Sequence, residues 1–252
     1  MISLRRMLLM LLAVSLLAAG GCVYWRLLKF KHQLDDFNTH FAFASDSSYA
    51  LVCLHPLLGG GDIDGLMEVA PSRREQQDGL EWRIYAFVKE PADGTAPLVY
   101  RLGFAEDRLS RIEFPAQFTQ LYPEDGLREL LASLGGADVD RGERSARARL
   151  ARERLAARLP DRAKLAAVLG EPSEHAAADS SETWSYRYRL DTVTQGRAER
   201  KRRATGEFHF DAAGQLTQLA AGIGKHVLRF DVETARGDEP ERKAQRGKGR
   251  NR

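Results

Sequence analysis

The stretch that decides the fold lies in the second half of the chain. Residues 182–190 read ETWSYRYRL and residues 206–216 read GEFHFDAAGQL. His209 alternates with Phe208 and Phe210, which is the two-residue period of a strand with one buried face. With two further extended segments, the sequence predicts a four-strand antiparallel meander over residues 183–191, 206–210, 215–220 and 226–233.

A similar order of signals occurs earlier in the chain. Pro71-Ser72 ends one short predicted helix and Pro172-Ser173 ends another. Trp82 and Trp184 then stand at the head of a strand, and we expect both to be core residues. We therefore predict an α+β fold of two tandem units, each with short helices packed on its own antiparallel sheet. The first unit is expected to contain strands at residues 49–55, 81–88, 97–104 and 108–114.

Helical signals fill the space between the strands. Residues 62–68, 123–134 and 161–169 are predicted helices, each closed by glycine or proline. Residues 141–159 are rich in arginine and alanine, which favours another helix. The predicted organisation is a signal sequence or anchor (1–21), a helical stalk (22–44), a first unit (45–136), a second unit (137–235) and a basic, disordered tail (236–252).

The second predicted unit resembles a known family. Val168-Leu169-Gly170-Glu171-Pro172, Thr183-Trp184-Ser185-Tyr186 and the segment 206–216 are similar to the helix stop, strand and hairpin of BamE/SmpA-like small bacterial lipoprotein domains. The resemblance covers about residues 161–221 and, more weakly, the first unit. It implies a fold of short helices packed on an antiparallel sheet and a role in outer-membrane assembly or maintenance. Its motifs describe packing rather than chemistry.

The N-terminus indicates export. Two arginines precede an apolar run over residues 7–19, and Gly20-Gly21-Cys22 follows. This layout is typical of an exported bacterial protein, and small residues before cysteine resemble a lipoprotein cleavage site at which Cys22 would be lipidated. Alternatively, the apolar run continues to Trp25 and forms an uncleaved transmembrane signal anchor. Both predictions place the body on the periplasmic face of the envelope, and the lipid anchor favours the outer membrane.

No motif in the sequence indicates catalysis. His55 with Asp62 and Asp64 is the nearest approach to a metal cluster, but a turn followed by a capped helix explains it. Cys53 lies in an apolar strand and is expected to be a core residue. Serine-nucleophile motifs, phosphate-binding loops and paired helical histidines are not found in the sequence. We therefore predict that the protein is not an enzyme and holds no metal or cofactor.

Basic stretches are the remaining candidates for a site. The chain is nearly balanced, with 38 Lys and Arg against 35 Asp and Glu. Local basic stretches are either solvated faces or contacts to anionic envelope lipids. An exported protein does not meet nucleic acid, and no aromatic residues interleave with these charges. The candidate residues for anionic-surface contact are Arg144, Arg147, Arg152, Arg154, Arg197, Arg200, Lys201, Arg202 and Arg203.

These observations predict a non-catalytic binding or scaffold module of the cell envelope. Its expected partners are the membrane, through the N-terminal anchor, and an envelope protein that contacts sheet edges or the arginine-rich segment. Two alternatives are a periplasmic enzyme inhibitor of the tandem-repeat type and, less favoured, a small envelope enzyme.

Overall fold

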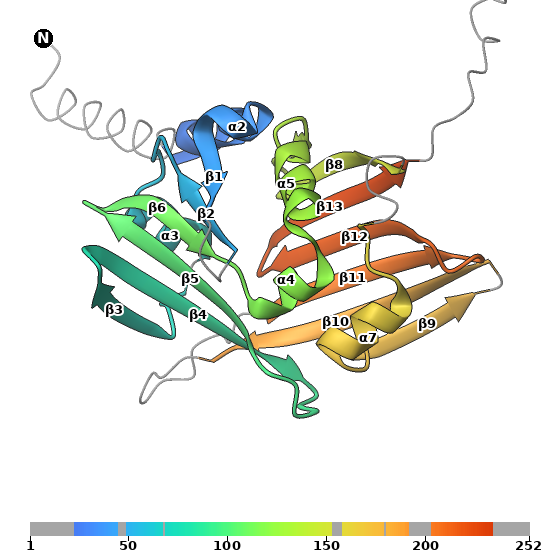
Figure 1. The fold of residues 1–252 in the computed structure, drawn as a ribbon. Coiled ribbons are helices and arrows are strands. Elements are labelled where there is room, and N and C mark those ends of the chain that lie inside the picture. The colour runs from blue at the N-terminus through green and yellow to red at the C-terminus, as the bar shows by residue number, and fades with distance from the viewer. Residues whose placement is uncertain are drawn as a thin grey trace, which may run out of the picture.

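The computed structural model describes residues 23–44, 49–67, 69–152, 158–178, 180–191 and 203–233. Within them, thirteen strands form one sheet with the path β1-β2-β6-β5-β4-β10-β11-β12-β13-β8-β7, while β3 pairs with β4 and β9 with β10 (Figure 1). The strands are β1 (Phe41–Phe43), β2 (Ala50–Cys53), β3 (Arg73–Gln77), β4 (Leu80–Glu90), β5 (Leu98–Ala105), β6 (Arg108–Glu113), β7 (Asp138–Asp140), β8 (Ser145–Ala151), β9 (Glu174–Ala178), β10 (Ser181–Leu190), β11 (Arg203–Asp211), β12 (Leu216–Ile223) and β13 (His226–Glu233).

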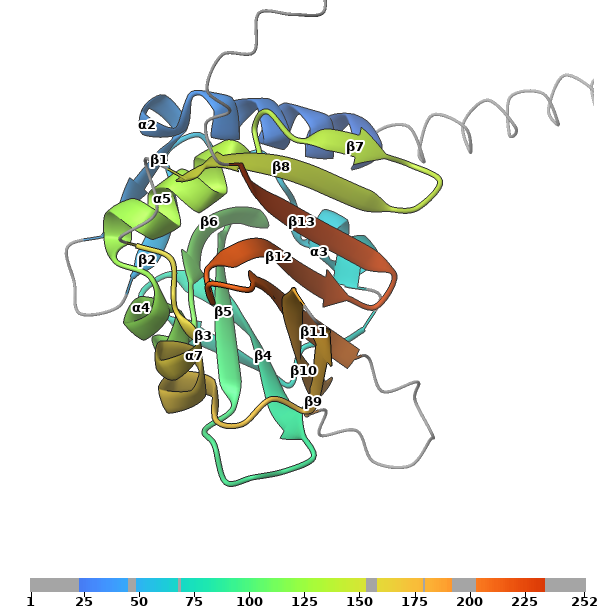
Figure 2. The same cartoon turned by 90° about the vertical axis from the view of Figure 1, so that its right-hand side faces the viewer.

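Short helices accompany the sheet. A helix over residues 23–35 is followed by α2 (Phe37–His40), and further on come α3 (Gly60–Met67), α4 (Ala116–Leu121), α5 (Glu124–Ser133) and α7 (Arg162–Leu169). Figures 1 and 2 show α4, α5 and α7 on one side of the curved sheet. The structure thus confirms the predicted helices near residues 62–68, 123–134 and 161–169 and the strands predicted in both halves. None of the helices described is long and apolar enough to cross a membrane.

The predicted division into two tandem helix-on-sheet units is wrong. The end of β4 pairs antiparallel with the end of β10, from Arg187 opposite Glu90 to Leu190 opposite Phe87. A strand edge exposes unpaired backbone N–H and C=O groups, and here the two free edges satisfy each other. The sheet is therefore continuous, and it is mixed because β8 and β13 run parallel.

The predicted arginine-rich helix over residues 141–159 is also wrong in its first half, because residues 145–151 form β8, while residues 153–157 lie outside the described residues. Ala148 and Leu150 are buried while Arg147 and Arg149 are exposed, which is the alternation of a strand. Arginine and alanine favour helices in isolation. The pairing of every β8 residue with β13 overrides that preference.

One large core cluster spans the sheet, with aromatic side chains at its centre. A smaller cluster joins the helix over residues 23–35 to β1 and β2, through Leu34, Phe37, Phe41, Leu51 and Cys53. The large cluster contains residues from both halves of the chain, among them Tyr85, Phe87, Phe104, Leu121, Leu150, Leu165, Tyr186 and Phe210. Burial of these groups supplies the main favourable term in folding.

Two groups of strands share local geometry although they belong to one sheet. We call β3–β6 the first strand group and β9–β12 the second strand group. The Ser72 hydroxyl accepts a hydrogen bond from the Ala86 N–H at 3.1 Å, and the Ser173 hydroxyl accepts one from the Arg187 N–H at 3.0 Å. A register shift follows in each group, at Gly103/Phe104 and at His209/Phe210.

This correspondence corrects the predicted match between the two tryptophans. Counted from the serine contacts, Trp184 is equivalent to Arg83, and Trp82 is equivalent to Thr183. Trp82 is buried opposite Gly103 under the Arg101 guanidinium, whose central carbon lies 4.4 Å from the ring centroid. Trp184 is only partly buried and packs edge-on against Phe210.

Candidate functional site

The end of the sheet formed by β7, β8 and β13 carries the most distinctive exposed surface in the described residues, and we call it the end-strand surface. A tight turn joins β7 to β8, in which the Glu143 N–H donates to the Asp140 carboxylate at 3.0 Å and Arg144 has a φ of 52°. Because the side chains of a strand alternate between its two faces, each face of this surface carries a different chemistry.

One face is charged. Arg147 on β8 lies opposite Arg229 on β13; Arg147 is exposed and Arg229 is half-buried. Arg147 lies 3.4 Å from the Asp231 carboxylate, and Arg149 lies 3.6 Å from that of Glu233. Like charges placed directly opposite each other are unfavourable, so this pair of arginines is stabilised only by neighbouring carboxylates or by a bound group.

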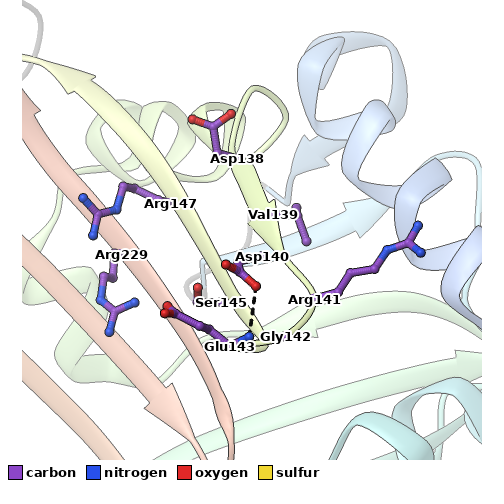
Figure 3. Close-up of a pocket in the computed structure, with 9 residues that line it drawn as sticks. All are labelled: Asp138, Val139, Asp140, Arg141, Gly142, Glu143, Ser145, Arg147 and Arg229. Carbon is purple, nitrogen blue, oxygen red and sulfur yellow. Dashed lines mark hydrogen bonds between the residues drawn. The ribbon is translucent and has the colours of Figure 1, made fainter.

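An open pocket of about 570 Å³ lies beside these arginines. Figure 3 shows the side chains that line it, which are Asp138, Val139, Asp140, Arg141, Gly142, Glu143, Ser145, Arg147 and Arg229. The lining therefore contains three arginines and three carboxylates. Small-molecule pockets are mostly apolar and enclose their ligand. A shallow, charged and balanced surface instead suits a macromolecule with a complementary charge pattern.

The opposite face of the same strands is apolar and exposed. Val139 pairs with Ala146, Ala146 with Leu228, and Leu228 with Ala221, so the four side chains form a row across β7, β8, β13 and β12. Val139 is 44% exposed and Leu228 is 39% exposed. They share a face with buried Phe230 but lie toward the turn end of the strands. We call these four residues the apolar row.

The start of the helix over residues 23–35 lies next to the β7–β8 turn. The Arg141 guanidinium stacks 3.9 Å from the centroid of the Tyr24 ring, and neighbouring Trp25 is 59% exposed. Figure 2 shows this helix running alongside β7 and β8. The end-strand surface is therefore on the side of the molecule where the N-terminal segment joins the body.

The structure scatters the basic residues that were predicted as contacts. Arg144 and Arg147 belong to the end-strand surface. Arg152 donates to the Gln215 side chain and to the Leu216 carbonyl at 3.0 Å, so its guanidinium links the end of β8 to the start of β12. Arg203 begins β11 and lies 3.8 Å from Glu90. The remaining predicted residues, Cys22, Arg154, Arg197, Arg200, Lys201 and Arg202, lie outside the described residues.

The acidic residues near His55 have structural partners. Asp62 is buried and accepts two hydrogen bonds from Arg26, at 2.7 and 2.5 Å, and one from the Gly59 N–H. The Arg26 hydrogen bonds, reinforced by the Gly59 contact, lower the pKa of Asp62 although burial opposes them. Asp64 pairs with Arg83. Among the described residues, no three His, Cys, Asp or Glu side chains gather closely enough to hold a metal.

Cys53 is a buried free cysteine, which confirms its predicted place in the core. Burial raises the pKa of its thiol to about 12. The reactive form of cysteine is the thiolate. The thiol therefore stays protonated and unreactive at neutral pH.

Sequence reasoning missed two buried cations. Arg83 donates at 2.9 Å to the Gly60 carbonyl and to Asp64, and Lys89 donates at 2.8 Å to the Leu169 carbonyl at the end of α7. Each sits at an inward position of β4. The only sequence signal is a charged residue where the strand period requires an apolar one.

Comparison of the chain with protein-family models, curated proteins and solved structures found no match. The resemblance to BamE/SmpA-like domains therefore stays a prediction from sequence.

Proposed function

We propose that the chain is a non-catalytic binding or scaffold module of the bacterial cell envelope. An N-terminal lipid at Cys22, or a signal anchor, holds it at a membrane, and the end-strand surface binds an envelope protein. The observation that carries this proposal is the apolar row, in which Val139 and Leu228 are exposed on either side of Ala146, while the opposite face of the same strands carries the charged pocket.

The combination of an apolar row on one face and a charge-balanced pocket on the other favours a protein partner over an anionic lipid surface. Exposed apolar side chains of this kind form the centre of protein interfaces. A polyanionic surface attracts a net positive patch, whereas the pocket on the charged face has three arginines and three carboxylates. The charges then fix the register of the partner rather than supplying attraction at long range.

The position of the surface is compatible with an anchored protein. Arg141 in the β7–β8 turn contacts Tyr24, next to the segment that we expect to enter the membrane. A partner bound there would meet the module close to the bilayer. The alternative of a tandem-repeat enzyme inhibitor rested on two separate helix-on-sheet units, and the continuous sheet removes that support.

Site-specific photo-crosslinking in intact cells tests the proposal. A photo-crosslinking amino acid at Ala221, an exposed member of the apolar row, should give a discrete protein adduct. The same amino acid at Leu54, which is 49% exposed on another part of the molecule, is the matched control and should not give that adduct.

Charge substitutions then test the surface. Val139→Glu with Leu228→Glu should lower the adduct yield about tenfold, the effect of about 1.4 kcal/mol, whereas Leu54→Glu should leave it unchanged. A protein adduct that survives the double substitution would contradict the assignment of the surface. Recovery of lipid alone would contradict a protein partner. Cys22→Ala, followed by palmitate labelling, separately distinguishes the lipid anchor from the signal anchor.

A further inference from the structure

Two histidines far from the end-strand surface face each other across the start of β1 and the end of β2. The Nδ1 atoms of His40 and His55 lie 3.2 Å apart, whereas their ring centroids are 5.0 Å apart. The two nitrogen-bearing edges are therefore directed toward each other. The contact is exposed, so an ion in the surrounding solution can reach it.

The backbone holds both residues in place. His40 ends α2, and its carbonyl accepts a hydrogen bond from the Leu54 N–H at 2.9 Å, one step beyond the β1–β2 ladder. The His55 carbonyl accepts one from the Gln33 side chain at 3.0 Å. Phe41, which follows His40, and Cys53, which lies two residues before His55, are buried partners in the register. The spacing of the two imidazoles is thus set by ordered main chain.

We propose that His40 and His55 form a two-histidine chelate for a borderline divalent transition metal such as Zn²⁺ or Cu²⁺. Imidazole nitrogen is a preferred ligand for both ions. With Zn–N distances of about 2.0–2.1 Å, the 3.2 Å separation corresponds to an N–Zn–N angle of about 103°. This value is close to the tetrahedral angle, so the rings need little rearrangement to bind one ion.

The protons balance without an external base. A hydrogen bond between the two Nδ1 atoms needs a proton on Nδ1 of one ring and a lone pair on Nδ1 of the other. When the metal binds, the donor ring carries its proton on Nε2 instead, and both Nδ1 lone pairs point to the ion. In the proposed site, water occupies the remaining coordination positions.

Metal titration of the full-length chain, purified in detergent without a histidine tag, tests the proposal. Calorimetry with ZnCl₂ should show one site per chain. His40→Gln or His55→Gln should weaken binding about a hundredfold, because the second imidazole binds as an intramolecular ligand. His32→Gln is the matched control, since its side chain is 73% exposed on the neighbouring helix, and it should bind as the unchanged protein does.

A spectroscopic measurement makes the test independent of the variants. One equivalent of Cu²⁺ should give an electron paramagnetic resonance spectrum with hyperfine coupling to two imidazole nitrogens. A spectrum showing one nitrogen would overturn the proposal. So would a His40→Gln/His55→Gln protein, with an unchanged circular dichroism spectrum, that binds Zn²⁺ as the unchanged protein does.

Discussion

The first and second strand groups share the same serine-to-backbone hydrogen bonds, but different side chains fill the interior beside them. Ser72 and Ser173 make equivalent contacts, and Tyr85 and Tyr186 are equally buried. The serines accept from the N–H groups of Ala86 and Arg187, which are therefore equivalent positions. Three residues before them, the first group has Arg83 and the second has Trp184. Three residues after them, the first group has Lys89 and the second has Leu190.

The difference shows that strand geometry does not dictate interior chemistry. Arg83 stacks over Phe104, with its central carbon 4.4 Å from the ring centroid, as Trp184 packs against Phe210. Both buried cations also donate to carbonyl groups of short helices, Arg83 to α3 and Lys89 to the end of α7. A cation is tolerated there because carbonyl and carboxylate oxygens accept its hydrogen bonds: Lys89 has three acceptors, and Arg83 donates to Gly60, Asp64 and Glu81.

Removing the buried lysine should have the largest effect. Lys89→Leu copies the residue of the second group, but it leaves the Leu169 and Glu171 carbonyls and Asp93 without their donor. We expect the free energy of unfolding to fall by about 3 kcal/mol, the lower end for a broken buried ion pair, because Asp93 is 30% exposed. Urea denaturation measures this. An unchanged urea midpoint for Lys89→Leu would mean that the leucine of the second strand group can replace the lysine of the first without loss of stability.

Acid should weaken the contact between α3 and the N-terminal helix. The pKa of Asp62 is lowered, chiefly by the Arg26 hydrogen bonds. The unfolded carboxyl binds a proton at a higher pH than the folded one, so the stabilisation is complete above about pH 4 and is lost as the pH falls further. Asp62→Asn should cost about 2 kcal/mol at pH 7.

The cost of Asp62→Asn should shrink between pH 4 and lower pH, which denaturation at a series of pH values will show. In the second strand group, the pKa of the Glu182 carboxyl is also lowered. The main cause is the hydrogen bond from the Trp184 indole N–H, and the charge of Arg162 adds to it. A pH-independent cost of Asp62→Asn would show that the Arg26 pair contributes nothing to folding.

The two equivalent tyrosines should respond differently to loss of their hydroxyls. The Tyr186 hydroxyl donates to the Gly170 carbonyl at 3.2 Å, whereas the buried Tyr85 hydroxyl has no hydrogen-bond partner among the described residues. Tyr186→Phe should cost about 1 kcal/mol and Tyr85→Phe should be neutral or stabilising. Thermal unfolding of the two single variants measures the difference, and equal effects would contradict it.

The local elements could be predicted from sequence because their signals are local. Alternation around His209 and the Pro-Ser helix stops correctly indicate strands and helix ends. The seam between β4 and β10 could not be predicted, because nothing in a strand's own sequence says which free edge it meets. The segment SARARLA at residues 145–151 does carry a strand alternation, but its composition is that of a helix.

The candidate sites depend on register, which the sequence does not reveal. Val139 and Leu228 fall in one row only because each pairs with Ala146, which lies between them. His40 and His55 meet only because β1 and β2 form a ladder. Of the predicted basic residues, Arg144 and Arg147 lie on the end-strand surface, and no feature of the sequence separates them from Arg152, which serves the fold.

The parallel pairing of β8 with β13 also sets an order of events during synthesis. Residues 145–151 leave the ribosome before the strands of the second group, yet their partner is the last strand of the described chain. Closing so long a loop is slow compared with forming hairpins. Until β13 is synthesised and pairs with β8, that edge of β8 has unpaired backbone groups. Arg147 and Arg149 reduce the risk that it pairs with another chain, because charged side chains disfavour such pairing.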